Sequence, residues 1–381
     1  MQNSANVALV YCEQYQLDEV RKAVKKGLDL LGGVEQFAKP QENILVKVNM
    51  LVGDSPDKCI GPHPMVFQAV LEQLLSAGSH VSFGDSPGFG SPRGAARQAG
   101  LLPVADELAV PLADFETPVT RTYTETHLIK QFTLTKAVTD CDGLISLCKL
   151  KSHALTRITG AVKNQFGCVP GILKAEFHSR LPNSKQFSQM LVDINLVVKP
   201  RLYIMDGIVA MEGNGPRNGT PRPMHVILLS TDPVALDAAV CRIIGLDEAL
   251  VETITYGNAF GLGSSQNISF LGEPLSRFAA PDFQVNRSKA STAIEKNSLS
   301  NSFMRNNLTP RPVINAKKCT RCGRCVQVCP AQPKALSWAN GEENAPVYDY
   351  SHCIRCYCCQ ELCPHQAITV KVPLLGKLIR R

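Results

Sequence analysis

Residues 319–330 read CTRCGRCVQVCP, and residues 353–364 read CIRCYCCQELCP. Both runs place cysteines at positions 1, 4, 7 and 11 and a proline at position 12, so the second run repeats the spacing of the first. Nine of the chain's 15 cysteines fall between Cys319 and Cys363. Close and regular spacing of this kind is typical of thiolates that ligate a metal centre, and not of a disulfide framework. The two runs therefore predict a metal–sulfur domain at the C-terminal end of the chain.

The spacing also predicts which cysteines act together. In bacterial ferredoxins three cysteines of such a run hold one [4Fe–4S] cluster, and the fourth, beside the proline, ligates the other cluster. The first predicted cluster has the ligands Cys319, Cys322, Cys325 and Cys363. The second has the ligands Cys353, Cys356, Cys359 and Cys329. Zinc is the alternative, but two runs of four cysteines exceed what a tetrahedral zinc site needs. Cys358 does not fit the repeat, and we expect it to be a packed thiol.

Composition limits the remaining possibilities. The chain has 381 residues, 44% of them hydrophobic, and a formal net charge of +7, so two folded domains are expected. No long uncharged apolar run predicts a membrane span, and the first residues lack the pattern of a secretory signal, so we expect a cytoplasmic protein. Aromatic residues make up 6% and do not interleave with a basic stripe, which disfavours nucleic-acid binding. The excess positive charge suits an anionic ligand or an acidic partner.

The first 275 residues alternate between short apolar runs and amphipathic stretches. Strands are expected over residues 5–10, 43–48, 80–83, 143–148, 201–205 and 225–230. Helices are expected over residues 17–31, 65–77 and 233–245, and Ser91-Pro92 is expected to begin another helix. Nearly continuous apolar strands that alternate with helices indicate an α/β domain with a mainly parallel sheet covered on both faces.

The composition changes again after this domain. Residues 276–312 are rich in Ser, Asn, Pro and Arg and are expected to form a linker. Residues 313–371 are expected to form an α+β ferredoxin domain of the bacterial two-cluster type, and residues 372–381 a basic tail. The tail is more consistent with a short docking segment than with a membrane anchor, because one weak signal seldom anchors a protein stably.

Polar residues gather where the predicted strands of the first domain end. Open α/β sheets bind ligands at this edge, the carboxyl ends of their strands. The candidates are Lys47, Asn49, Asp85, Lys149, Lys151, His153, Thr159, Lys163, Asn164, Glu212 and Asn214. Simpler alternatives exist, since Gly-Asp-Ser-Pro-Gly at 84–88 is also a common turn, the loop at 212–219 can be merely flexible, and the lysines can form an ordinary solvated face.

Roles follow from the chemistry of these side chains. Three lysines and a histidine beyond an apolar strand cannot all face the core unpaired, so Lys149, Lys151, His153 and Lys163 are expected to hold an anionic group. The predicted catalytic residues are Lys163, His153, Asp85 and Glu212, the last two as proton-transfer groups. The predicted cofactor-binding residues are Lys47, Asn49, Lys149, Lys151, Thr159, Asn164 and Asn214. No Gly-x-Gly-x-x-Gly stands at a strand-to-helix turn, which disfavours a nicotinamide site.

Four segments of the chain carry a resemblance to a known family. They are ILVKVN (44–49), GDSPG (84–88), KLKSHALTRITGAVKNQFGCVPG (149–171) and DGIVAMEGNGPRNG (206–219). The chain resembles the iron–sulfur-associated proteins of the domain-of-unknown-function 362 family, many of which carry the same C-terminal ferredoxin module. The resemblance covers essentially the whole chain. It implies the architecture and leaves the reaction open.

A second and more distant resemblance concerns the middle of the chain. Residues 153–163 (HALTRITGAVK), with His178 downstream, are similar to a segment of nickel-pincer lactate racemases. That resemblance implies a cofactor tether at Lys163, an acid/base role for His153 and a metal ligand at His178. The chain departs from the racemases at Pro170-Gly171, which falls later, and in the loop at 84–86, which lacks their second catalytic histidine. His178 is otherwise explained as a residue on the surface of a helix.

Three functions remain compatible with these patterns. The first is an oxidoreductase or electron-transfer component. Its two [4Fe–4S] clusters exchange electrons with a redox partner protein and with a small anionic ligand or cofactor bound by the α/β domain. The second is an isomerase-like or cofactor-handling enzyme with a second cofactor or metal near Lys163 and His178. The third is an electron carrier fused to a docking domain without catalysis.

Overall fold

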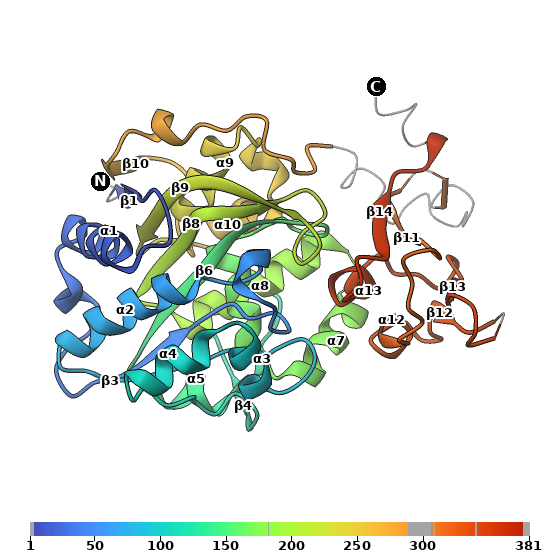
Figure 1. Ribbon diagram of the computed structural model, residues 1–381, viewed down its shortest axis with the longest axis horizontal. Helices are drawn as coiled ribbons and strands as arrows, with labels where there is room; N and C mark the ends of the chain where they lie inside the picture. The colour runs from blue at the N-terminus through green and yellow to red at the C-terminus, as the bar shows by residue number, and fades with distance from the viewer. Residues whose placement is uncertain (1–3, 182, 289–305, 308, 340, 376–381) are drawn as a thin grey trace.

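A large α/β domain and a small cysteine-rich unit make up the part of the chain that the computed structural model describes, residues 4–181, 183–288, 306–307, 309–339 and 341–375. The small unit, residues 311–371, is named the cluster module below. It lies against one end of the α/β domain, beside helix α7 (Gly171–Arg180) (Figure 1). Both expected units of the fold class are confirmed.

The α/β domain is built on one mixed sheet of eight strands. The strands are β1 (Ala5–Tyr11), β2 (Asn43–Lys47), β3 (His80–Gly84), β6 (Gly143–His153), β7 (Arg157–Thr159), β8 (Leu202–Glu212), β9 (Thr220–Ser230) and β10 (Ile268–Gly272). Their order is β10-β1-β9-β8-β6-β2-β3, with β7 paired to β6. The pairs β2–β3, β2–β6, β6–β8 and β1–β10 are parallel, whereas β9 runs antiparallel to both of its neighbours. The expected mainly parallel sheet is confirmed, with β9 as an interior exception that a short connection joins to β8.

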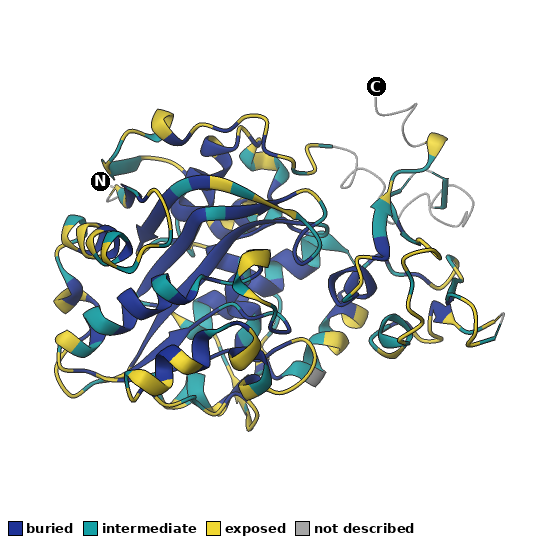
Figure 2. Ribbon diagram, viewed as in Figure 1, coloured by how far each residue is buried: buried dark blue, intermediate teal, exposed yellow. Residues whose placement is uncertain are grey.

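Helices cover both faces of the sheet, because successive strand residues point to opposite sides. One face packs on α1 (Leu17–Leu30), α2 (Pro64–Ser76), α3 (Pro92–Gln98) and α4 (Leu101–Glu107). The other packs on α6 (Ala161–Asn164), α8 (Ser184–Val198), α9 (Pro233–Ile243) and α10 (Glu252–Ala259). In β8, for example, Ile204 joins the first core, and Tyr203 and Met205 join the second. The sheet is therefore buried between two layers (Figure 2).

Several smaller elements complete the α/β domain. They are the hairpin β4 (Pro118–Thr122) and β5 (Gln131–Thr135), the helix α5 (Lys136–Asp140), and the 3-10 helices η1 (Val34–Gln36), η2 (Pro56–Lys58), η3 (Gln165–Cys168), η4 (Glu248–Leu250) and η5 (Leu275–Phe278). The expected helix starts are confirmed. The Asp232 carboxylate accepts hydrogen bonds from the first turn of α9, and the Ser91 hydroxyl caps α3.

The cluster module contains two short strand pairs and two short helices. Strand β11 (Arg311–Ile314) pairs with β14 (Ile368–Lys371), and β12 (Leu336–Ser337) pairs with β13 (Val347–Tyr348). Helices α12 (Arg324–Gln327) and α13 (Cys358–Glu361) occupy equivalent places in the two cysteine runs. The sequence repeat is thus also a repeat of structure.

Two expectations about boundaries need correction. Strands β6 and β8 continue to His153 and Glu212, so the polar residues expected in loops after residues 148 and 205 belong to the strands themselves. They remain in the sheet because most find polar partners there. The α/β domain also extends beyond residue 275, since Phe278 and Phe283 are buried in its core. Much of the predicted linker and tail, residues 289–305, 308 and 376–381, lies outside the described residues.

Candidate functional site

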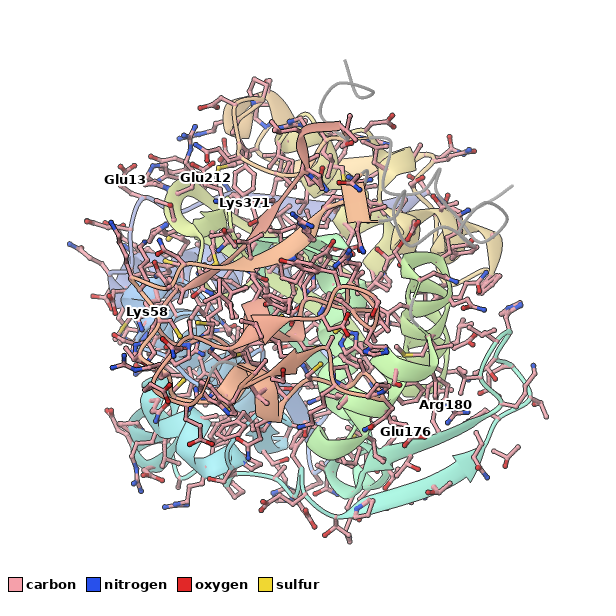
Figure 3. All side chains as sticks on the ribbon, turned by 90° about the vertical axis from the view of Figure 1, so that its right-hand side faces the viewer. Glu13, Lys58, Glu176, Arg180, Glu212 and Lys371 are labelled. Carbon is pink, nitrogen blue, oxygen red and sulfur yellow. The ribbon has the colours of Figure 1, made fainter. Side chains whose placement is uncertain are left out.

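A cavity of about 380 Å³ lies between the α/β domain and the cluster module. The α/β domain lines it from the end of β2, from the loop after β3 and from helices α6 and α7. The cluster module lines it with Val328, Cys358, Glu361 and Leu362. Seen from the module's side, the module lies in front of this end of the domain, above and to the left of Glu176 and Arg180 of α7 (Figure 3). The site therefore requires both halves of the chain.

One wall of the cavity is a fully buried ion pair. The Nζ atom of Lys47 lies 3.0 Å from Oδ1 of Asp85, and it donates a hydrogen bond of 2.8 Å to Oδ1 of Asn164. The other oxygen of Asp85 accepts a bond of 2.8 Å from the backbone N–H of Met50. At Gly167 a Cβ atom would lie only 1.8 Å from the Asp85 carboxylate, so a larger residue there would displace the ion pair. Lys47 is therefore neutralised by its own surroundings.

Asn49 connects this wall to a second buried lysine. The Nζ atom of Lys151 donates to Oδ1 of Asn49 at 2.7 Å and to the backbone carbonyl of Ile60 at 2.6 Å. The Nδ2 group of Asn49 in turn donates to Oδ1 of Asn164 at 3.2 Å. Burial, together with the nearby Lys163, lowers the pKa of Lys151 to about 7. Lys151 thus does not line the cavity but holds Asn49, which does.

Lys163 is the lysine with the fewest partners in the cavity. Within the described residues its Nζ atom makes no hydrogen bond, and it lies over the ring of Phe166, 5.8 Å from the ring centre. Burial lowers its pKa. The buried Asp237 fixes the start of α6 by accepting hydrogen bonds of 2.7 and 3.2 Å from the N–H groups of Ala161 and Val162. The short helix is thereby held so that Lys163 lines the cavity.

Helix α7 contributes Lys174 and His178 to the cavity wall, and the two lie on one face because they are four positions apart. The His178 ring stacks on Phe187, with ring centres 4.5 Å apart, and is 7% exposed, so the alternative explanation of a helix-surface residue is wrong. Burial lowers the pKa of His178 to about 4, which leaves the ring neutral near pH 7. Lys174 donates to the backbone carbonyl of Ser86, and burial lowers its pKa to about 8.

The cluster module contributes a buried carboxylate. Oε1 of Glu361 lies 3.1 Å from Nε2 of His153. Nδ1 of His153 accepts hydrogen bonds from the backbone N–H groups of Leu155 and Thr156, so the ring proton resides on Nε2 and faces Glu361. Burial lowers the pKa of His153 to about 4. Burial alone would raise the pKa of Glu361, but His153 and Lys163 outweigh it and lower that pKa.

The loop at 212–219 holds the two halves together. The Gln360 side chain donates to Oδ1 of Asn214 at 3.0 Å and to its backbone carbonyl at 2.9 Å, while Asn218 donates to the Gln360 carbonyl at 2.9 Å. Arg217 donates to the Leu362 carbonyl at 3.1 Å. The structure therefore gives Asn214, which was predicted to bind a cofactor, a role in docking the cluster module.

Three other predicted site residues do not line the cavity. Glu212 accepts a hydrogen bond of 2.9 Å from the backbone N–H of Gln284 and lies near the upper edge of the module in Figure 3, so its position does not support the predicted proton-transfer role. Lys149 forms a separate buried ion pair of 2.7 Å with Asp206. Thr159 is buried, and its hydroxyl has no hydrogen bond among the described residues. These groups were expected at loop ends, but they belong to buried strands.

Two smaller cavities inside the module collect the cysteines. One is lined by Cys319, Cys322, Cys325 and Cys363 and is named the outer site. The other is lined by Cys329, Cys353, Cys356 and Cys359 and is named the inner site. Each of these sites has about 20 Å³ on the measure that gives about 380 Å³ for the large cavity. Each site combines three cysteines of one run with the fourth of the other.

This arrangement of donors fits [4Fe–4S] clusters, in which each of four thiolates binds a different iron atom. Across the described part of the chain, no three His, Cys, Asp or Glu side chains converge so as to hold a metal ion, and the thiols surround open spaces instead. Once bound, the clusters supply one-electron chemistry. Cys322 of the outer site is exposed, whereas Cys353 and Cys359 of the inner site are buried.

Among the ionisable groups of the large cavity, sequence reasoning missed Lys174, Cys358 as a wall residue, and Glu361. The spacing of Lys174 and His178, four residues apart as on one face of a helix, could have revealed the first. The other two sit in the second cysteine run, where nothing local indicates that the loop faces another domain. Lys47, Asn49, Asp85, Lys163 and Asn164 were predicted, and the structure brings them together here.

Comparisons with known proteins agree with this architecture. Residues 44–242 match the family model described as Domain of unknown function (DUF362), and residues 311–364 match that of a 4Fe-4S dicluster domain. A thylakoid-associated protein of Synechocystis sp. is 37% identical over 258 residues, which cover 68% of this chain and 80% of that protein.

Two solved structures show weaker likeness. The lactate racemase apoprotein of Thermoanaerobacterium thermosaccharolyticum gives a TM-score of 0.41 at 10% identity, covering 62% of this chain and 56% of that one. A protein from Thermotoga maritima gives 0.38 at 12% identity, covering 70% and 63%. The chain thus spans less than two thirds of either solved protein. From the family match and the Synechocystis relative, the chain belongs to the DUF362 family and carries a C-terminal 4Fe–4S dicluster domain.

Proposed function

We propose that this chain is an iron–sulfur redox protein, in which two [4Fe–4S] clusters relay electrons to or from a small anionic ligand in the cavity between the domains. One observation carries the proposal. The cysteine run that lines the inner site also supplies Cys358 and Glu361 to the cavity wall. A ligand in the cavity would therefore lie next to the loop that holds the inner cluster.

The charges around the cavity support an anionic ligand. Asp85 neutralises Lys47, and the Glu361 carboxylate faces His153. Lys163 and Lys174 have no carboxylate within ion-pair distance among the described residues. Two amines outside any ion pair favour a carboxylate or phosphate group between α6 and α7. The volume of about 380 Å³ is within the range of small-molecule sites.

The predicted roles can now be divided by position. Lys163 and Asp85 line the cavity and remain the proposed catalytic residues that touch the ligand. His153 reaches the cavity only through Glu361, so we assign it a positioning role. Lys47, Asn49 and Asn164 form the wall that orients the ligand.

Blocking the mouth of the cavity tests the proposal. Ala175 is an exposed residue of α7 that lines the cavity, and Ser179 is an exposed residue of the same helix that does not. Dithionite-reduced, anaerobic protein would be desalted and mixed with a low-molecular-weight cell extract, and reoxidation would be followed by cluster absorbance. We expect Ala175→Trp to slow reoxidation by about tenfold or more, because the ligand is excluded, and Ser179→Trp to leave it unchanged. Equal rates in all three proteins would contradict the proposal and favour a carrier without a ligand site.

A second candidate function rests on Lys163. An amine without hydrogen bonds, whose pKa burial lowers, is more often unprotonated and hence nucleophilic. Such an amine could carry a covalently attached group, as a cofactor-handling enzyme requires. Intact mass of the purified protein tests this, with Lys163→Arg as the control. Added mass on the wild type alone favours attachment, and the unmodified mass in both proteins contradicts it.

The cellular location of the protein is also a proposal. In the described portion of the chain, no helix combines the length and apolar character needed to cross a bilayer. A cytoplasmic location is our expectation, and cell fractionation with an antibody against the chain would test it.

A further inference from the structure

The outer site differs from the inner site in its access to solvent. In the outer site Cys322 is exposed, Cys319 and Cys325 are partly exposed and Cys363 is buried. The inner site has two partly exposed and two buried thiols, and none that is fully exposed. Electron exchange between proteins needs a centre close to a surface that a partner can reach. Of the two sites, the outer one meets this condition.

Cations surround the outer site. Four exposed residues form what we name the cationic face: Lys317, Lys318, Arg321 and Lys334. Lys317 and Lys318 lie on the turn directly before the ligand Cys319. Lys334 donates to the carbonyls of Val326 and Gln327, at the end of α12. In the described chain no member of this face forms an ion pair. Their charges are therefore open to solvent.

The second cysteine run shows that this charge is specific to the outer site. Positions 34 residues later correspond in the repeat, so Ser351 and His352 stand where Lys317 and Lys318 stand in the first run. Arg355 corresponds to Arg321, but it is only 9% exposed and donates to Asn306. The repeat has thus kept the ligands of both sites and placed exposed cations at one of them.

Two exposed carboxylates border the cationic face without neutralising it. Glu342 and Glu343 follow in the sequence, and Arg321 donates to the backbone carbonyl of Glu343 at 3.2 Å, not to its carboxylate. Between residues 317 and 343 five cations, the four of the face and Arg324, stand against these two anions. Arg324 instead lies over the ring of Phe89 in the α/β domain, 4.5 Å from the ring centre.

We propose that the cationic face is the docking surface for an acidic one-electron carrier protein, which exchanges electrons through the outer site. The inference rests on the proposed electron relay and names its partner. In each exchange the reduced carrier loses one electron and one oxidised [4Fe–4S] centre of this chain gains it, with no bond or proton transferred. Opposite charges on the two proteins accelerate their encounter and orient the complex.

Stopped-flow reduction of the anaerobic holo-protein by a reduced acidic [2Fe–2S] ferredoxin tests the proposal. The variant is Lys317→Gln/Lys318→Gln/Arg321→Gln. The control is Lys22→Gln/Lys25→Gln/Lys26→Gln, which removes the same charge from exposed positions on α1. We expect the triple variant to lower the second-order rate constant by about tenfold at low ionic strength, and the control to leave it unchanged. Reduction by methyl viologen, a small cation, should be at least as fast in the triple variant as in the wild type, because removing positive charge does not repel a cation.

A binding measurement provides a second readout that does not depend on activity. Carbodiimide cross-linking of the wild type to the ferredoxin, mapped by mass spectrometry, should join Lys317 or Lys318 to ferredoxin carboxylates. If the triple variant loses its clusters, the salt dependence of the wild type decides. A rate that falls with added salt supports the proposal, and a rate that is constant or rises overturns it.

Other outcomes also overturn the docking surface. Equal rates in the variant and the wild type, equal losses in variant and control, or cross-links confined to α1 would do so. A further contradicting outcome concerns membranes. If the triple variant kept the wild-type reduction rate but lost binding to vesicles containing phosphatidylglycerol, the face would contact a membrane and not a carrier protein. Cluster reduction is measured without a cavity ligand, so failure here leaves the proposed ligand site standing, and failure of the Ala175→Trp test leaves this surface standing.

Discussion

The outer and inner sites carry the same ligand pattern in very different surroundings. The outer site has an exposed thiol and exposed cations around it. The inner site has two buried thiols, and its cysteine run supplies Cys358 and Glu361 to the cavity shared with the α/β domain. The repeat in sequence therefore gives the two sites the same set of donors, while tertiary contacts give them different surroundings. We propose that the outer site exchanges electrons with a partner protein and that the inner site exchanges electrons with the ligand.

The largest expected effect comes from breaking the crossed ligation. If Cys363 belongs to the outer site, Cys363→Ala/Cys322→Ala damages one site only and should keep about four irons per chain. Cys363→Ala/Cys356→Ala damages both sites and should keep almost none. Iron and sulfide analysis after anaerobic purification measures this. Ligation within each run would reverse the two results and contradict the assignment, while Cys358→Ala should keep about eight irons.

The next effect concerns Arg217, which joins the α/β domain to the cluster module. Arg217 pairs with Asp54 at 2.8 Å, both side chains being under a tenth exposed, and it also binds the Leu362 carbonyl. Arg217→Ala should lower the free energy of opening between the domains by about 2 kcal/mol, because buried charge-assisted hydrogen bonds are lost.

Hydrogen exchange of residues 358–363 measures this opening, and about 2 kcal/mol corresponds to roughly thirtyfold faster exchange. Arg222→Ala is the matched control, because its pair with Asp282 is exposed and contributes about 1 kcal/mol or less. Identical exchange in the two variants would show that Arg217 does not hold the module.

The smallest effect should distinguish the two clusters electronically. The Tyr348 hydroxyl donates a hydrogen bond of 3.2 Å to the Cys359 sulfur of the inner site. Hydrogen bonds to cluster sulfurs stabilise the reduced, more negative state. Tyr348→Phe should therefore lower one of the two reduction potentials, by on the order of tens of millivolts, in a redox titration followed by EPR. A shift in both potentials, or in neither, would contradict the assignment of this tyrosine to the inner site.

How much was predictable differs between the two domains. The cysteine spacing alone predicted the membership of both cysteine-lined sites, because ferredoxin ligation is encoded locally and the repeat is regular. Lys47, Asp85 and Lys163 were also predicted as a group, because strand ends in a parallel sheet meet at one edge. The rule failed where strands ran on, as at Lys149 and Glu212.

The contribution of the cluster module to the cavity was not predictable. Glu361 lies in the spacer between Cys359 and Cys363, and its sequence neighbourhood says nothing about His153, more than 200 residues away. The loop at 212–219 contacts the cluster module through two asparagines, an arginine and backbone groups, which resemble those of any polar loop. Interfaces of this kind depend on shape and on complementary hydrogen bonds across distant segments.

Iron-edge anomalous diffraction from anaerobically grown crystals of the full chain tests the central claim most directly. The account predicts two iron peaks, one among Cys319, Cys322, Cys325 and Cys363, and one among Cys329, Cys353, Cys356 and Cys359 on the side of the module that faces the cavity. Iron at only one of these positions would contradict it. Two peaks would also contradict it if the cluster module lay elsewhere on the α/β domain, so that the inner peak did not border the cavity.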